Sequence, residues 1–152
     1  MRYWKILTIS LFLIGCKSSN NADSIGKLDG ICIPMIDSFF QKVESKNYNA
    51  AIDDLLSSNE NIDLRDSATI ALKGKFSSIN QFSGAYRGNS LIKKKSLNDD
   101  IAVYSYLAKY DKKFYRFVFV FYNNGLKTKI YKFLFDDTAE LEIEESLKLY
   151  MY

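Results

Sequence analysis

The chain has 152 residues, which suits one compact domain and is too short for two ordinary ones. Hydrophobic residues make up 47% of it and charged residues 26%, so most of the chain is expected to fold. Histidine is absent, which excludes the commonest general base and the commonest zinc ligand. Two cysteines are too few for a disulfide scaffold or a four-cysteine metal site. A net charge of +3 is too weak to indicate nucleic-acid binding, and no cofactor or metal is expected.

The amino terminus, residues 1–15, has the layout of a secretory signal peptide. Arg2 and Lys5 form a basic start, and the run from Ile6 to Ile14 is almost wholly apolar. This run is roughly half of the ~20 residues that a membrane-spanning helix needs. The alternative interpretation is an ordinary buried helix.

The sequence Leu13-Ile14-Gly15-Cys16 resembles the lipobox of bacterial lipoproteins. The resemblance implies cleavage before Cys16, attachment of a diacylglycerol to its thiol, and a membrane as the partner of the lipid. Residue 17 is Lys rather than Asp, which by the same resemblance favours the outer membrane of the cell envelope. Cleavage would remove two of the 21 basic residues and none of the 18 acidic ones, leaving a net charge of +1. A nearly neutral domain gives no electrostatic case for nucleic acid.

Residues 16–27 are rich in Ser, Asn, Asp and Gly, which predicts a flexible tether between the lipid and a single domain over residues 28–152. With Cys16 acylated, Cys32 has no partner. Its neighbours are apolar, which is typical of an inert buried thiol rather than a nucleophile.

Three helices are expected in the first half of the domain. Pro34 suits the first turn of a helix that ends near Lys46, with apolar residues at helical spacing between them. A second, short helix begins near Tyr48 and is closed by residues 57–59. Asp63 is a plausible N-cap for a third helix that ends before Ser83. The expected apolar stripe of this third helix consists of Ala68, Ala71, Leu72, Phe76 and Ile79.

The second half alternates with period two, which predicts strands at 85–96, 101–110, 113–122 and 127–135 joined by short turns. A two-residue turn at Asp111-Lys112 pairs Tyr106 with Phe117 and Tyr104 with Phe119. A three-residue turn with Gly125 in the left-handed conformation would pair Phe117 with Tyr131 and Tyr115 with Phe133. This register gathers nine rings on one face, which we expect to pack on the helices: Tyr104, Tyr106, Tyr115, Phe117, Phe119, Phe121, Tyr131, Phe133 and Phe135.

Helices followed by a four-stranded antiparallel meander predict an α+β domain, with the N-terminal helices on one face of the sheet. Residues 139–152 fit a helix or a strand, and the spacing from Asp137 to Glu140 favours a helix. The segment Phe39-Phe40, the stretch from Lys46 to Ile52 and the Phe82–Tyr86 junction resemble the NTF2-like and cystatin-like superfamily. The resemblance supports the fold, and a fold does not fix a function.

Three functions are compatible with these features. The first is a non-enzymatic binding or accessory module of the envelope that recognises a protein or a glycan through the face opposite the rings. The second is an NTF2-like enzyme acting on a small or glycan ligand, for which the resemblance implies an Asp–Tyr set from Tyr86, Tyr104, Tyr106 and Asp136. The third is an inhibitor or immunity lipoprotein. No catalytic constellation is evident, so the first is preferred. Its candidate binding residues are Val103, Arg116, Val118, Val120, Ile130 and Lys132.

In the expected register Arg116 lies directly opposite Lys132, an unfavourable pair that needs a carboxylate or a ligand as compensation. The acidic residues between Glu140 and Glu145 offer an internal alternative. In that case the C-terminal segment, through Ile143 and Leu147, would cover this face.

Overall fold

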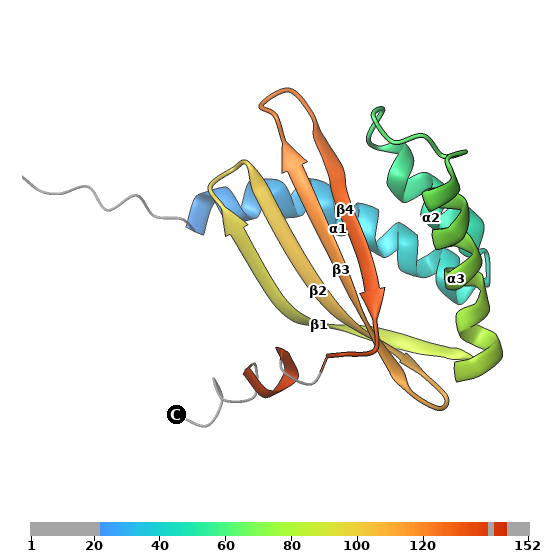
Figure 1. Ribbon diagram of the computed structural model, residues 1–152. Helices are drawn as coiled ribbons and strands as arrows, with labels where there is room; N and C mark the ends of the chain where they lie inside the picture. Colours follow the sequence, from blue (N-terminus) through green and yellow to red (C-terminus); the bar gives the residue numbers. More distant parts are fainter. Residues whose placement is uncertain (1–21, 140–141, 146–152) are drawn as a thin grey trace, which may run out of the picture.

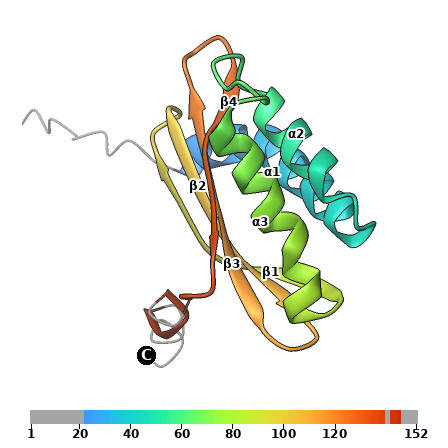
Figure 2. The ribbon, with the colours of Figure 1, turned by 45° about the vertical axis from the view of Figure 1, so that its right-hand side comes forward.

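The computed structural model describes residues 22–139 and 142–145, and within them it confirms the expected α+β architecture. Three helices pack on one face of a four-stranded antiparallel meander in the order β1-β2-β3-β4 (Figure 1). A short helical turn at residues 142–145 lies on the opposite side of the sheet from the three helices (Figure 2). The elements are α1 (Ala22–Glu44), α2 (Tyr48–Ser57), α3 (Ser67–Ser83), β1 (Tyr86–Leu97), β2 (Ile101–Tyr110), β3 (Phe114–Asn123) and β4 (Thr128–Asp136).

The first helix is longer than the sequence predicted. Helix α1 begins at Ala22 and contains Pro34 in its interior, so Pro34 does not mark its start. Residues 22–27 are helical, so the predicted flexible tether is wrong for this part, while Cys16 and the rest of the predicted tether lie outside the described residues. The buried stripe runs through the proline, from Leu28 and Cys32 to Ile36. Because Pro34 lies on the exposed side, the missing backbone hydrogen bond falls where water can replace it.

Helix α2 is as predicted, with Ala51, Ile52, Leu55 and Leu56 buried. The N-cap of α3 is Asp66 rather than Asp63: its carboxylate accepts a hydrogen bond from the backbone N–H of Thr69 at 2.6 Å. Asp63 instead accepts from the N–H of Arg65 in the preceding turn.

The predicted stripe of α3 is correct only in its second half. Phe76 and Ile79 are buried and Leu72 is partly buried, but Ala68 and Ala71 are exposed. Thr69 and Ser83 are buried instead, because they continue the helical spacing of Leu72, Phe76 and Ile79 in both directions, whereas Ala68 and Ala71 lie beside that stripe.

The four strands lie within one residue of their predicted bounds, and the register between β2 and β3 is also correct, with Tyr106 opposite Phe117 and Tyr104 opposite Phe119. The register between β3 and β4 is wrong. Phe117 lies opposite Phe135 rather than Tyr131, and Phe119 rather than Tyr115 lies opposite Phe133.

The cause of this shift is the turn after β3. It spans residues 124–127, so it begins one residue later and is one residue longer than the expected turn over 123–125. The side chain of Asn124 closes it by accepting hydrogen bonds from the N–H groups of Leu126 and Lys127. Gly125 does adopt the positive φ that was predicted. An irregularity then falls at Tyr131, where Val120 pairs with Lys132 and Phe121 with Ile130. As a result Ile130 is buried beneath the helices and Tyr131 is 68% exposed.

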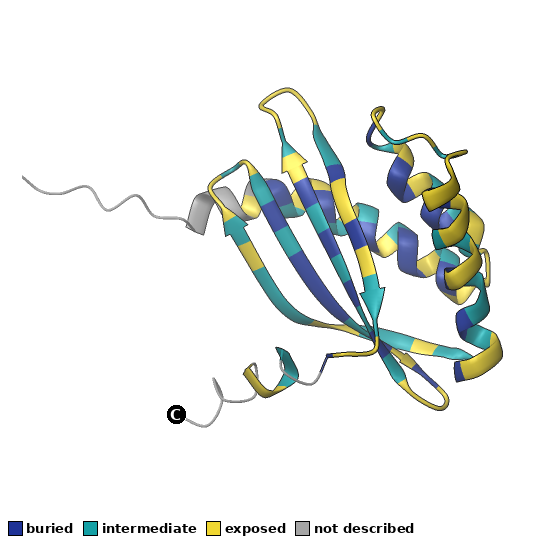
Figure 3. Cartoon of the chain, in the orientation of Figure 1, coloured by how far each residue is buried: buried dark blue, intermediate teal, exposed yellow. Residues whose placement is uncertain are grey.

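The core lies between the helices and the sheet and consists largely of aromatic rings (Figure 3). Phe39 from α1 contacts Phe76 from α3 and Phe117 and Phe119 from β3, with ring centroids 5.3–6.0 Å apart. Of the nine rings predicted to face the helices, only Tyr131 is exposed, while Phe135 is partly buried.

Candidate functional site

The sheet surface turned away from the three helices, here called the open face, carries a group of exposed apolar side chains. Its apolar side chains come from all four strands, and four of them are more than a third exposed: Leu97, Tyr122, Tyr131 and Leu134. Further apolar side chains of this face are partly exposed: Ile101, Val103, Leu107, Phe114, Val118 and Val120. A shallow apolar groove of about 290 Å³ lies among Ile101, Val120, Phe121, Tyr122 and Tyr131. An apolar surface of this kind marks an interaction site more often than a scatter of single residues does.

Five of the six candidate binding residues lie on the open face: Val103, Arg116, Val118, Val120 and Lys132. Ile130 is the exception, because the irregularity at Tyr131 turns it into the core. Its backbone is also bound by the loop after α2, where Asn59 Nδ2 donates to the carbonyl oxygen of Ile130 at 2.8 Å and the Ile130 N–H donates to Ser58 Oγ at 3.0 Å.

Arg116 does not lie opposite Lys132, so the predicted like-charge contact is wrong. The partner of Arg116 across the strands is Asp136, and its guanidinium donates to the Asp136 carboxylate at 2.7 Å. This bond raises the pKa of Arg116 further above its ordinary range. Glu142 lies 3.5 Å from the same guanidinium, so a carboxylate of the C-terminal segment does reach this face. Lys132 is exposed and forms no ion pair with a described residue.

The C-terminal helical turn binds the open face through its carboxylates. Glu142 accepts a hydrogen bond from the Ser105 hydroxyl at 2.7 Å, and Glu145 accepts one from Lys93 Nζ. Together with Lys95 and Val103, these four residues line an open groove of about 260 Å³, here called the carboxylate groove. Ile143 is partly buried and Glu144 is exposed, while Leu147 lies outside the described residues.

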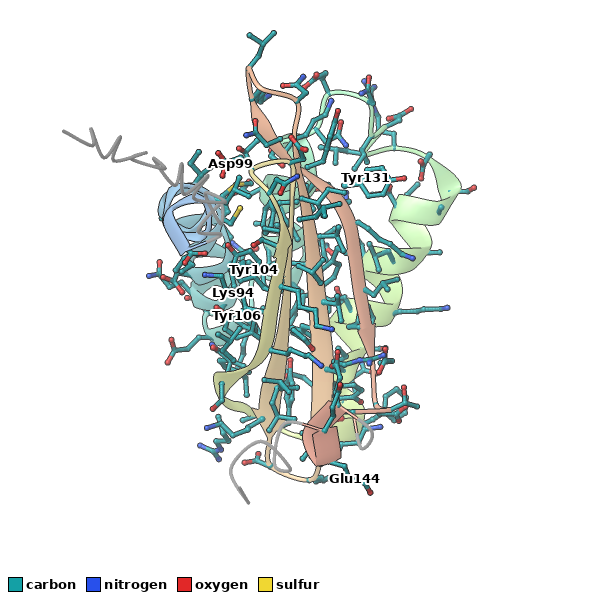
Figure 4. The ribbon with its side chains drawn as sticks, turned by 90° about the vertical axis from the view of Figure 1, so that its left-hand side faces the viewer. Lys94, Asp99, Tyr104, Tyr106, Tyr131 and Glu144 are labelled. Carbon is teal, nitrogen blue, oxygen red and sulfur yellow. The ribbon has the colours of Figure 1, made fainter. Side chains whose placement is uncertain are left out.

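A second polar cluster, which the sequence did not reveal, joins α1 to the helix-facing side of the sheet. Tyr104 donates a hydrogen bond to Asp29 Oδ1 at 2.6 Å, and Lys94 Nζ donates to the other carboxylate oxygen. Burial opposes ionisation of Asp29, but these two bonds and the charge of Lys94 outweigh it and lower its pKa. Figure 4 shows Lys94 and Tyr104 beside α1.

This second cluster is not arranged for nucleophilic chemistry. Cys32 of α1 lies in the same cluster, where it interacts with Tyr104. Burial raises the pKa of Cys32 to about 11 and that of Tyr104 well above its ordinary range, so both groups keep their protons at neutral pH. The cluster instead ties the N-terminal half of α1 to β1 and β2. Side chains alternate between the two faces of a strand, so one or two of the three consecutive lysines of β1 must face the helices. Lys94 is that residue: it pairs with Tyr104, while Lys93 and Lys95 point to the open face. This alternation was the signal in the sequence that could have revealed the cluster.

The Asp–Tyr set considered for an enzyme is not assembled. Tyr104 and Tyr106 face the helices, whereas Asp136 lies on the open face with Arg116. The space between helices and sheet is filled by rings that are almost fully buried, among them Phe39, Phe117 and Phe119. Within residues 22–139 and 142–145, no three His, Cys, Asp or Glu side chains are grouped so as to hold a metal ion.

No protein-family model, curated protein or solved structure was found to match the chain. Among the helices described here, none has the length and apolar character needed to cross a membrane.

Proposed function

We propose that this protein is a lipid-anchored, non-enzymatic module of the cell envelope that binds another protein through the open face. The observation that carries the proposal is the set of exposed apolar side chains on that face, above all Leu97, Tyr131 and Leu134. A partner that covered this patch would gain a favourable free energy of about 25 cal/mol for each Å² of apolar area removed from water.

A protein suits this surface better than a small substrate. The grooves of the open face are shallow and open to solvent, whereas small molecules are usually bound in cavities that enclose most of their surface. The apolar centre is bordered by cationic side chains, including the exposed Lys95 and Lys132. An apolar centre with a polar rim is the usual composition of a protein interface.

The lipid anchor is proposed from the sequence alone, because Cys16 and its neighbours lie outside the described residues. The support is the order of features: a basic start, a short apolar run, and Leu13-Ile14-Gly15-Cys16. Stable anchoring requires at least two acyl chains, since one chain gives only marginal membrane binding. The outer membrane is the proposed location, given Lys17 after the cysteine.

Replacing Cys16 by Ala is expected to abolish lipid attachment and to leave the signal peptide uncleaved. Metabolic labelling with a fatty-acid analogue should mark the wild-type chain and leave the variant unlabelled. Cys32→Ala is the matched control, because this buried cysteine is not the proposed acylation site, and it should be labelled like wild type. Absence of label on the wild-type chain would contradict the anchor.

Photo-crosslinking tests the binding face directly. A photoreactive residue at Tyr131 or Leu134 is expected to capture one and the same envelope protein in intact cells. The controls are Ile70 and Phe82 on α3, which are apolar and at least as exposed as Leu134 but lie on the helical side. Leu134→Glu should reduce capture from Tyr131 at least about tenfold, because it places a charge in the apolar centre. The matched change Ile70→Glu should leave capture unchanged. Equal capture from both sides of the molecule would refute the proposal.

A further inference from the structure

The carboxylate groove resembles a binding site with an occupant already in it. Glu142 and Glu145 are three residues apart on one helical turn, so their side chains fall on the same side of that turn. That side faces the sheet, where Ser105 and Lys93 bind the two carboxylates. Glu144, labelled in Figure 4, is exposed.

The groove is built for a carboxylate. Ser105 is only 2% exposed, and its hydroxyl is oriented toward Glu142. Arg116 adds a positive charge 3.5 Å from the same carboxylate oxygen, and it is held in place by Asp136. A fixed hydroxyl beside a fixed guanidinium gives a charge-assisted site, in which hydrogen bonds are stronger than those between neutral groups.

The C-terminal turn does not use all of the donors in this region. The Nε atom of Arg116 is buried and has no hydrogen-bond partner. Lys95 lines the groove, is exposed, and forms no ion pair with a described residue. An unsatisfied buried donor is costly, so a ligand that supplied an additional acceptor would bind with an advantage over the chain's own segment.

The interactions that bind the C-terminal turn to the sheet are also weak. The side chain of Glu145 is 64% exposed, and ion pairs of that exposure contribute little because water screens them. Of the two carboxylates Glu142 is the better buried, with a side chain that is 26% exposed. A competitor that places a carboxylate at the position of Glu142 would therefore replace the better-buried of the two contacts.

We infer that the open face recognises an acidic, amphipathic segment of its protein partner, and that Glu142 and Glu145 occupy the same site in cis when the partner is absent. The inference rests on the proposed function and adds the chemistry of the partner and its regulation. The partner's carboxylates take the places of Glu142 and Glu145 in the carboxylate groove, and its apolar side chains cover Val103, Val118 and their neighbours. Release of the chain's own turn exposes the full face.

A competition experiment tests this inference on the full-length chain in detergent. The probe is a fluorescent peptide that copies residues 138–147 of the chain, and fluorescence anisotropy measures its binding. The double variant Glu142→Gln/Glu145→Gln should bind the peptide at least about tenfold more tightly than wild type. A tenfold gain would mean that the groove is free in about one tenth of wild-type molecules. Glu144→Gln, in the same turn, is the matched control and should bind like wild type.

A second peptide, with every Glu replaced by Gln, shows whether the carboxylates are what is recognised. Its binding to the double variant should be at least about tenfold weaker. Equal binding of the first peptide to wild type and double variant, or no binding to either, would overturn the inference, as would indifference to the Glu-to-Gln changes in the peptide. Dimerisation of wild type that depends on Glu142 would also overturn it, because the turn would then act on a second copy.

The outcomes separate this inference from the proposed function. If the peptide does not bind as expected while capture from Tyr131 is still reduced by Leu134→Glu, the inference of an acidic partner segment is wrong, but the proposed binding through the open face is supported. If capture is the same from both sides of the molecule, the proposed function fails whatever the peptide does.

Discussion

Replacing Phe117 by Ala is expected to reduce the free energy of unfolding by about 3–5 kcal/mol, much of the stability of a domain of this size. The Phe117 side chain is fully buried in the middle of β3. Its ring contacts Phe39 and Phe40 from α1, Phe76 from α3 and Phe133 from β4, with centroids 5.7–6.0 Å apart. The cavity left by the ring would therefore border every layer of the core, and no single neighbour is placed to fill it. Unfolding in urea, followed by circular dichroism, measures the loss.

The neighbouring residue provides the control. Val118 is next in the same strand but points to the open face, where it is partly exposed. Val118→Ala removes fewer buried atoms and should cost clearly less than Phe117→Ala. Phe119→Ala should behave like Phe117→Ala, because Phe119 is equally buried beside Phe39 and Phe133. Equal costs at positions 117 and 118 would mean that the faces of the sheet are assigned the wrong way round.

The strands were predictable because two local signals agree along this part of the chain. Aromatic and aliphatic residues alternate with polar ones in β2 and β3, and the short turn at Asp111-Lys112 leaves one register that keeps the rings on one face. The burial of Tyr104, Tyr106, Phe117 and Phe119 follows from that register alone.

The register of β4 was not predictable from the same signals. The turn that the Asn124 side chain closes is one residue longer than expected, and an irregularity at Tyr131 then changes which residues face the core. Neither feature is defined by the hydrophobic pattern of the strand. The hydrogen bonds that join the Ile130 backbone to Ser58 and Asn59 link residues more than 70 positions apart, so no local spacing in the sequence indicates them.

The start of α1 was missed for a related reason. A proline usually marks a helix end, so Pro34 suggested a first turn. The buried stripe of Leu28, Cys32 and Ile36 shows that tertiary packing outweighs one missing hydrogen bond on the exposed side. A helix that starts at Pro34 leaves Asp29 outside it, next to the predicted tether. The hydrogen bond between Asp29 and Tyr104 was therefore not predicted.

Loss of Asp29 is expected to have the second-largest effect, about 2 kcal/mol for Asp29→Ala. The Tyr104 hydroxyl, in a residue that is 1% exposed, would lose its acceptor, and Lys94 would lose the carboxylate it binds. Hydrogen bonds to a charged group contribute about 1.5–3 kcal/mol each, and partial exposure of Asp29 and Lys94 reduces the total. Asp54→Ala is the control, because Asp54 binds Lys42 at 3.0 Å but is 63% exposed, and its loss should cost well under 1 kcal/mol.

The contribution of Asp29 should also depend on pH, in a direction fixed by its pKa. The pKa of Asp29 is lowered in the folded chain, below its ordinary value of 3.8, so the folded state binds a proton less readily than the unfolded state. Its stabilising effect is therefore complete above the ordinary value and is lost as the pH falls below it, through the lowered pKa.

Unfolding curves of wild type and Asp29→Ala should be well separated at pH 6 and should converge as the solution is made more acidic. Glu60, whose pKa is lowered to about 2, and Asp111, whose pKa is also lowered, lose their contributions in the same direction, but they do so in both chains and cancel from the difference. A separation that stays constant from pH 6 to below pH 3 would show that Asp29 acts through packing rather than through its charge. A separation that widens in acid would contradict the direction of the pKa shift, and with it the bonds from Lys94 and Tyr104 that outweigh burial at this carboxylate.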